Sequence, residues 1–414
     1  MRRFASLLLG LLAGLPVGQA AETVDRRFIE ITVGEEKYQG RQVVSDAHAC
    51  WLMERDGRLR NINLTDVTSF KKLGNVFRPY TANELKTRLL KEFGKTYQVE
   101  ASGYHAVVAP AGKEKACAKI VDMTSDSFIS YFGRRNIKLD RLEAPMVTVV
   151  FPSQKEFLDY CDRDGVKKIN GLRGYYSPST NRVALYLEQP AKPAKAFYGD
   201  LAVPQSPLHR AADDSALLPF SRLTPYGAPQ AATTFQDTLA HETTHQMGFN
   251  CGLHSRLGDD PTWIIEGMAM LFEGDANRDD ARQQSSIAQR MNRERFAWFL
   301  EYQKGRRPKK ALEEFLTSEA LFQTNTLDAY SEAWALTFFL AETRSSNLSA
   351  YLKRLANRTD LGEYSAMKRL NDFKAVFGKD INHLEVQYLR FINQLELPQP
   401  ELTAAVPDPL GLKP

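Results

Sequence analysis

The sequence predicts an α+β protein: a small β module, then a mixed sheet packed against helices, then a helical C-terminal lobe. Residues 22–70 hold short runs in which apolar and polar residues alternate, as in strands. Residues 80–188 alternate between helical and strand patterns, and from residue 233 to about 395 the apolar residues recur at helical spacing. With 414 residues, of which 43% are hydrophobic and 25% charged, the chain has the size and composition of a globular protein of two or three domains.

Residues 1–21 have the layout of a secretory signal peptide. Arg2 and Arg3 precede the apolar run FASLLLGLLAGLPV, and the small residues GQAA follow it, so cleavage is expected after Ala20 or Ala21. A membrane anchor is the alternative, but 14 apolar residues are short for a bilayer. We therefore expect an exported protein, periplasmic or extracellular, with no stable membrane anchor after signal removal. The formal net charge of +4 includes these two arginines, and the small remaining excess does not indicate a nucleic-acid partner.

Residues 22–75 form the expected β module. Its runs RFIEITV, GRQVV and ACWLMERDGRLRNINL have the composition of strands. The last run contains the turn Asp56-Gly57, which predicts a hairpin.

Residues 76–232 supply the expected mixed sheet. The helical segments TANELKTRLLKEFG, CAKIVDMTSDSFISYFG and SQKEFLDYC alternate with the strand segments YHAVVAP and APMVTVVFP, and GYYSPSTNRVALYLE adds a turn and a further strand. Residues 189–232 contain seven of the 20 prolines and no clear period, so we expect an insertion that is either a lid over a cleft or a surface decoration. The helical lobe with the metal site follows over 233–395, and composition predicts a disordered tail over 396–414.

The four cysteines have spacings that match no zinc-knuckle pattern: Cys50, Cys117, Cys161 and Cys251. In an oxidising compartment they could form two disulfides in any of three pairings. Free buried thiols are the alternative, and the sequence does not choose between them.

The segment AHETTHQMGF carries the strongest functional signal. If it is helical, His241 and His245 lie four residues apart on one face and can reach a single ion, with Glu242 beside them. Thr233 and Gln236 have the spacing of a capping box, which supports a helix start just before this segment. The alternative is an ordinary helix with two solvated histidines.

A catalytic zinc needs a third protein ligand, and PTWIIEGMAMLFEGD offers one. Glu266 lies among bulky apolar residues, where a carboxylate needs a partner such as a metal ion. Glu273 lies two turns further along the same face and is expected to support the ligands. The alternative for Glu266 is a surface acid on an amphipathic helix.

These motifs resemble those of the gluzincin zinc metallopeptidases. His-Glu-x-x-His is followed, after a connector of 20 residues, by Trp-x-x-Glu-Gly-x-Ala-x-x-x-Glu, a segment shared with the zinc aminopeptidases. The resemblance covers roughly residues 100–395, with tight matches at 241–245 and 263–273 and a looser one at 330–336. GYYSPSTNRVALY, HETTHQ, GLHSR and PTWIIEGMAMLFE together are also similar to a poorly characterised group of secreted bacterial proteins with a gluzincin-like domain.

The resemblance implies a gluzincin-like fold and one zinc per chain, with Glu242 as general base and a ligand set made of His241, His245 and Glu266. Such an ion acidifies water, which Glu242 could deprotonate before passing the proton to the leaving amine.

The reaction also needs a donor for the oxyanion. In related aminopeptidases a tyrosine in the pattern Tyr-x-Lys-Gly-Ala has this role, and here DAYSEAWALTFFL makes Tyr330 the candidate, with Glu332 and Ala333 replacing lysine and glycine. Packing in the core is the alternative for Tyr330. In the connector NCGLHSRLGDD, Arg256 and His254 are alternative donors; we expect Arg256 to support the ligands and His254 to be a loop residue. The remaining histidines are expected to be structural: His48, His105, His209 and His383.

Together these features predict an exported zinc-dependent peptidase that acts on a peptide or protein substrate. The strand NRVALYLE is expected to hold the peptide by β-addition at a sheet edge, as in gluzincins. The Gly-x-Met-Glu-Asn element with which aminopeptidases hold a free α-amine does not occur, so an endopeptidase, or an enzyme that trims an unusual amide, is favoured over an aminopeptidase. Two rivals are a non-catalytic gluzincin-like binding protein and a cell-envelope interaction module in which the β module and the Pro-rich segments do the work.

Overall fold

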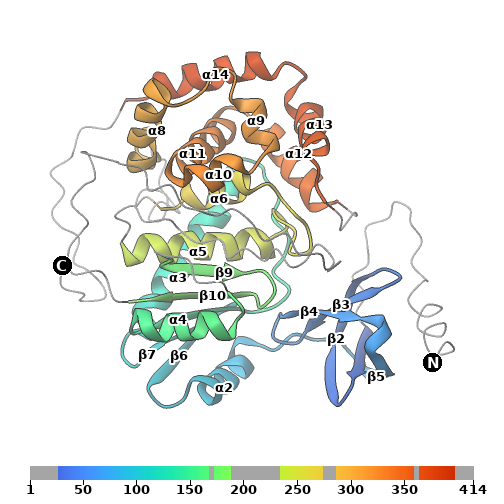
Figure 1. The fold of residues 1–414 in the computed structure, drawn as a ribbon. Helices are drawn as coiled ribbons and strands as arrows, with labels where there is room; N and C mark the ends of the chain where they lie inside the picture. Colours follow the sequence, from blue (N-terminus) through green and yellow to red (C-terminus); the bar gives the residue numbers. More distant parts are fainter. Residues whose placement is uncertain (1–26, 167–171, 188–233, 274–285, 359–362, 397–414) are drawn as a thin grey trace.

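The computed structural model describes residues 27–166, 172–187, 234–273, 286–358 and 363–396 (Figure 1). These residues form two five-stranded sheets and a helical C-terminal region, which confirms the predicted α+β class. The expected signal peptide, the insertion 189–232 and residues 397–414 of the tail lie outside the described residues. Among the described helices, none has the length and apolar character needed to cross a membrane.

The N-terminal β module is an antiparallel sheet with the strand order β4-β3-β2-β1-β5. The predicted hairpin is confirmed: β3 and β4 pair Met53 with Leu59, and Gly57 in the turn has φ +86°, which favours glycine. The strand β5, which the sequence patterns did not single out, closes the sheet beside β1. The strand bounds are β1 Arg27–Val33, β2 Glu36–Ser45, β3 Ala49–Glu54, β4 Leu59–Asn63 and β5 Val67–Val76.

The second sheet has the order β6-β7-β8-β10-β9 and is mixed, as predicted. Parallel pairs join β7 to β8 and β8 to β10, whereas β6 and β9 pair antiparallel at the two edges. The prediction that NRVALYLE offers a free edge to a peptide is wrong, because this strand is β10 and has a neighbour on each side. The bounds are β6 Tyr97–Ser102, β7 His105–Pro110, β8 Met146–Phe151, β9 Gly174–Ser177 and β10 Arg182–Tyr186.

Helices cover both faces of the second sheet because its strands are apolar on both sides. Along β7, Ala106 and Val108 pack against the helices on one face of the sheet, while Val107 and Ala109 pack against the helices on the other face. The first layer contains α2 Ala82–Phe93 and α4 Gln154–Arg163, and the second contains α3 Glu114–Arg134 and α5 Phe235–Asn250.

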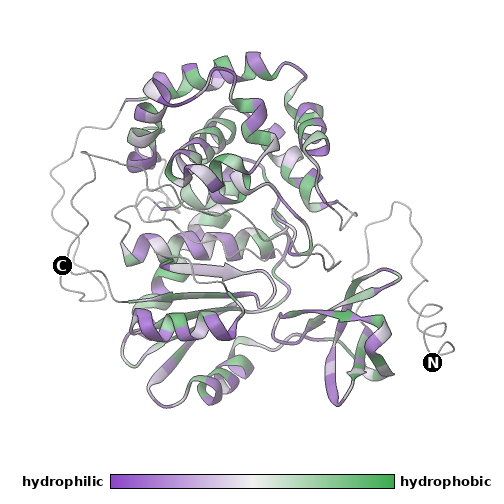
Figure 2. Cartoon of the chain, in the orientation of Figure 1, coloured by the Kyte–Doolittle hydropathy of each residue, from purple (hydrophilic) through white to green (hydrophobic). Residues whose placement is uncertain are grey.

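The C-terminal region is built around α11 Thr326–Thr343, which is buried along nearly its whole length. It contacts α6 Thr262–Met270 and α8 Arg293–Gly305, and Figure 1 shows α5 lying between this helical region and the second sheet. On the outside, α14 Ile381–Asn393 alternates hydrophilic and hydrophobic residues (Figure 2), since only one of its faces is buried. The remaining helices are α9 Leu312–Thr317, α10 Ala320–Thr324, α12 Ser345–Ala356 and α13 Ala366–Phe377.

All four cysteines are free and buried. Each belongs to a different hydrophobic cluster: Cys50 in the β module, Cys161 and Cys117 on opposite faces of the second sheet, and Cys251 in the helical region. Burial raises the pKa of each thiol to about 12. The structure therefore favours free thiols over the two possible disulfides.

Candidate metal centre

Helix α5 carries two of the three candidate ligands, His241 and His245, and most of its residues are buried. Its first turn is closed by a capping box between Thr234 and Asp237, one residue later than the predicted pair of Thr233 and Gln236. At its other end, the Gln246 side-chain amide donates to the carbonyl oxygens of Val147 (3.1 Å) and Asn181 (2.8 Å). These bonds fix the helix to β8 and to the β9–β10 turn directly after the second histidine.

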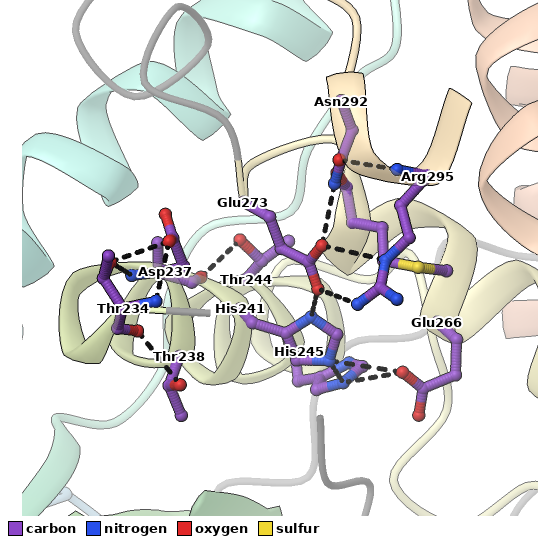
Figure 3. Close-up of polar contacts among 12 residues, drawn as sticks. Thr234, Asp237, Thr238, His241, Thr244, His245, Glu266, Glu273, Asn292 and Arg295 are labelled. Atoms are coloured by element: carbon purple, nitrogen blue, oxygen red, sulfur yellow. Dashed lines mark hydrogen bonds and ion pairs between the residues drawn. The ribbon is translucent and has the colours of Figure 1, made fainter. Parts of the chain in front are cut away.

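The structure brings the three predicted ligands together at one point (Figure 3). His241 Nε2 and His245 Nε2 lie 3.0 Å apart, and Glu266 Oε2 from α6 lies 3.2 Å and 3.6 Å from them. The three ligand atoms all lie within 4.8 Å of one another, and all three residues are buried. Among the described residues this is the one His, Cys, Asp or Glu cluster with the geometry of a metal site.

The charge of the site fits a divalent cation. Glu242, Glu266 and Glu273 are buried carboxylates, and the guanidinium of Arg295 forms an ion pair with Glu273. With neutral imidazoles the group carries two net negative charges, which is costly away from water unless a cation balances them. Two nitrogen donors and one oxygen donor also suit a borderline cation such as zinc.

Protonation of the two imidazoles is unequal in the absence of a metal. Burial by itself would lower the pKa of His241, but its bonds with Glu266 and Glu273 outweigh burial and raise the pKa to about 10. Burial lowers the pKa of His245 to about 4, despite the nearby Glu266. Since the two Nε2 atoms are 3.0 Å apart, one shared proton is the arrangement that their geometry allows, and a bound metal would displace it.

Glu273 lies directly behind His241, as the sequence predicts for a supporting residue (Figure 3). His241 Nδ1 and Glu273 Oε1 are 2.9 Å apart, an arrangement that fixes which ring nitrogen faces a metal. Glu273 is in turn held by Asn292 and Arg295 from the start of α8. The sequence analysis did not find these two residues, since their contact with Glu273 depends on where the start of α8 lies relative to the end of α6.

Tyr330 comes to the same site from α11. Burial raises its pKa well above the usual value, and the charges of Glu266 and Glu242 act in the same direction, so its hydroxyl stays protonated. Glu332, which replaces the lysine of the aminopeptidase pattern, forms a buried ion pair with Arg307 at 2.7 Å and 2.8 Å. The departure from the pattern therefore has a structural role of its own.

The connector residues lie elsewhere. Arg256 donates to the carbonyl oxygens of Pro178 (2.8 Å), Gly57 (2.8 Å) and Ser179 (3.5 Å), so it joins its own loop to the β9–β10 and β3–β4 turns instead of supporting a ligand side chain as predicted. 

His254 packs on α5 one turn beyond His245. A Cβ at Gly248 would lie 2.8 Å from its ring, so only glycine admits His254 there. Its Nδ1 is 3.6 Å from Asp260 Oδ2. Of the remaining histidines, His209 lies outside the described residues, and none of the other three joins the cluster.

One protein-family model matches the chain, over residues 236–362, and it is described as "Protein of unknown function (DUF1570)". The match includes His241, Glu242, His245, Glu266 and Tyr330, and it covers less than half of the chain. No curated protein matches the chain.

Proposed function

We propose that this protein is an exported zinc-dependent peptidase of the gluzincin type, with endopeptidase action favoured over exopeptidase action. The observation that carries the proposal is the convergence of His241, His245 and Glu266 beside a carboxylate, Glu242, that is buried in the same helix. A site that only bound a metal would have no need of an additional acid beside the three candidate ligands.

Zinc is the metal we infer, because two imidazoles and one carboxylate form the ligand set that catalytic zinc sites use while leaving one position open. Bound there, a zinc ion would supply Lewis acidity that polarises a carbonyl group and acidifies water.

The chain's own residues supply the proton transfers and the positioning. Glu242 follows His241 directly, so its carboxylate can accept a proton from water and deliver it to the leaving amine. Tyr330, kept protonated by its raised pKa, can donate a hydrogen bond to the oxyanion that develops on the substrate carbonyl. Among the described residues the edge strands of the second sheet are β6 and β9, and β9 packs beside α5, so a bound peptide would pair with β9.

Two substitutions test the proposal separately. Glu242→Gln should keep stoichiometric zinc and the fold but lose cleavage of a peptide library, because an amide cannot relay a proton. His245→Ala should lose stoichiometric zinc. His383→Ala is the matched control for removal of an imidazole, since His383 lies exposed on α14.

Wild-type cleavage rates in Glu242→Gln would exclude Glu242 as the base, and full zinc occupancy in His245→Ala would overturn the ligand assignment. A wild-type protein that binds zinc but cleaves no member of the library would instead support the non-catalytic binding protein. The contact of Arg256 with Gly57 joins the β module to the body of the molecule, which disfavours a module that acts independently at the cell envelope.

A further inference from the structure

Both carboxylate oxygens of Glu273 are held in place (Figure 3). Oε1 lies 2.9 Å from His241 Nδ1 and accepts from Arg295 Nη2 at 3.3 Å. Oε2 accepts from Asn292 Nδ2 at 2.7 Å and from Arg295 Nε at 3.2 Å. The guanidinium of Arg295 therefore reaches both oxygens with two of its nitrogens, as a fork.

The start of α8 holds this fork rigidly. Asn292 is the N-cap of α8: its Oδ1 accepts from the Arg295 backbone N–H at 3.1 Å, and its Nδ2 also donates to the Met270 carbonyl at 3.2 Å. The side chain of Arg295 is only 3% exposed, so water cannot replace its bonds. Its guanidinium carbon also lies 5.7 Å from the centre of the Tyr330 ring.

We propose that Arg295 is a positioning residue for the metal centre: by holding Glu273 it fixes the His241 ring with Nε2 toward His245 and Glu266. The inference rests on the metal site of the proposed function and deepens it. The same guanidinium lies within cation–π range of the Tyr330 ring, so Arg295 is close both to a candidate ligand and to the candidate oxyanion donor.

Positioning and simple charge predict opposite effects on zinc affinity. If Arg295 acted only as a nearby positive charge, its removal would leave the site more negative and would tighten the binding of a cation. If it acts by holding Glu273, its removal frees the carboxylate and the His241 ring and weakens binding. Loss of residues that support metal ligands typically weakens metal binding about 10–100-fold.

The test measures the Kd for Zn²⁺ by competition with a chromogenic chelator on the purified protein. Arg295→Met should raise this Kd about 10–100-fold. Arg295→Lys should lie between Arg295→Met and wild type, because an ammonium is a single point charge that cannot span both oxygens as a fork does. Glu273→Gln should weaken Zn²⁺ binding similarly. The double variant should have a Kd no higher than that of the weaker-binding single variant, because both substitutions break the same Arg295–Glu273 interaction.

Arg290→Met is the matched control. Arg290 also grips a carboxylate with two nitrogens, Nε at 3.3 Å and Nη2 at 2.6 Å, but its partner is Glu342 of α11 and not Glu273. This variant should bind Zn²⁺ as wild type does, with circular dichroism confirming that every variant is folded. If Arg295→Met does not fold, Arg295→Lys carries the comparison.

Unchanged or tighter binding in the folded Arg295 variants, or independent effects of Arg295 and Glu273 in the double variant, would overturn the inference while leaving the proposed function intact. Weaker binding in the control Arg290→Met to the same degree would also overturn it, since the effect would not depend on Glu273. A wild-type protein that binds no Zn²⁺ would overturn both the inference and the metal site.

Discussion

Tyr330 is the residue whose role kinetics can decide most directly. It combines a buried aromatic ring, packed against Phe322 at 5.7 Å between ring centres, with a hydroxyl whose pKa burial raises well above the usual value. If the hydroxyl stabilises the oxyanion, Tyr330→Phe should lower kcat at least about 100-fold with little change in KM, because that bond forms mainly in the transition state. Steady-state kinetics on zinc-replete protein measures this.

Zinc content and the melting temperature are the controls for Tyr330→Phe. Both should stay close to wild type, since the ring and its packing remain. An unchanged kcat would remove Tyr330 from the mechanism and leave it as a core residue. His254, which packs on α5 one turn beyond His245, would then be the next donor to test.

For individual residues, the sequence predicted the three members of the candidate metal cluster, but only some of the residues that contact them. His241 and His245 follow from helical spacing, and Glu266 follows from a carboxylate in an apolar helix. Glu273 was also found as a supporting residue, although α6 ends at Met270 and Glu273 is therefore not on the helix face that the sequence predicted. Arg295 could not be predicted, because its contact depends on the packing of a separate helix and no spacing relates it to the ligands.

Among the elements, α5 begins with a capping box, as the sequence predicted, but the box lies one residue later than the predicted one. Thr233 with Gln236 and Thr234 with Asp237 both have capping-box spacing, so the sequence offers two starts. In the structure Thr234 and Asp237 form the box, and Phe235, the first helical residue, is buried against the second sheet. The helix start at Thr234 is thus the one at which the first helical residue, Phe235, is buried.

Thr234→Ala tests the position of this cap. Removal of an N-cap hydroxyl typically costs about 1 kcal/mol, and here the loss should appear in the free energy of unfolding measured with denaturant. Thr233→Ala is the control and should change stability by less than about 0.5 kcal/mol. A larger effect of Thr233→Ala than of Thr234→Ala would place the helix start one residue earlier.

Strand pairing was harder to predict than strand location. The run NRVALYLE is a strand, as its composition indicates, but its place inside the sheet depends on the parallel pairing of Val183 with Thr148 across a long stretch of sequence. No local pattern contains that partner. The edge β6 was missed because its alternation is short and polar.

For the molecule as a whole, Arg256 is one of the polar links between the β module and the second sheet. Its guanidinium donates to the carbonyl of Gly57 in the β3–β4 turn and to that of Pro178 in the β9–β10 turn. Next to it, the Leu59 amide donates to the Ser179 carbonyl at 2.7 Å. From the same turn, Asn181 accepts from Gln246 on α5, so contacts run continuously from the module to the metal helix.

Arg256→Met should lower the free energy of unfolding by about 2–4 kcal/mol, because it leaves buried carbonyl groups without donors. Denaturant unfolding measures the change. Arg55→Met is the control, because Arg55 is also in the β module but its side chain is 32% exposed, and its loss should cost less than about 1 kcal/mol. Equal losses of unfolding free energy in the two variants would show that the contacts of Arg256 stabilise the protein no more than those of an exposed arginine.

The distribution of the cysteines gives the molecule a set of internal reporters. Since each hydrophobic cluster that holds a thiol holds only one, an alkylating reagent can reach a given thiol only when that particular cluster opens. The rate of labelling at Cys50 would follow opening of the β module, and that at Cys251 would follow opening of the helical region. Peptide mapping after brief alkylation could therefore rank the parts of this protein by local stability without any engineered label.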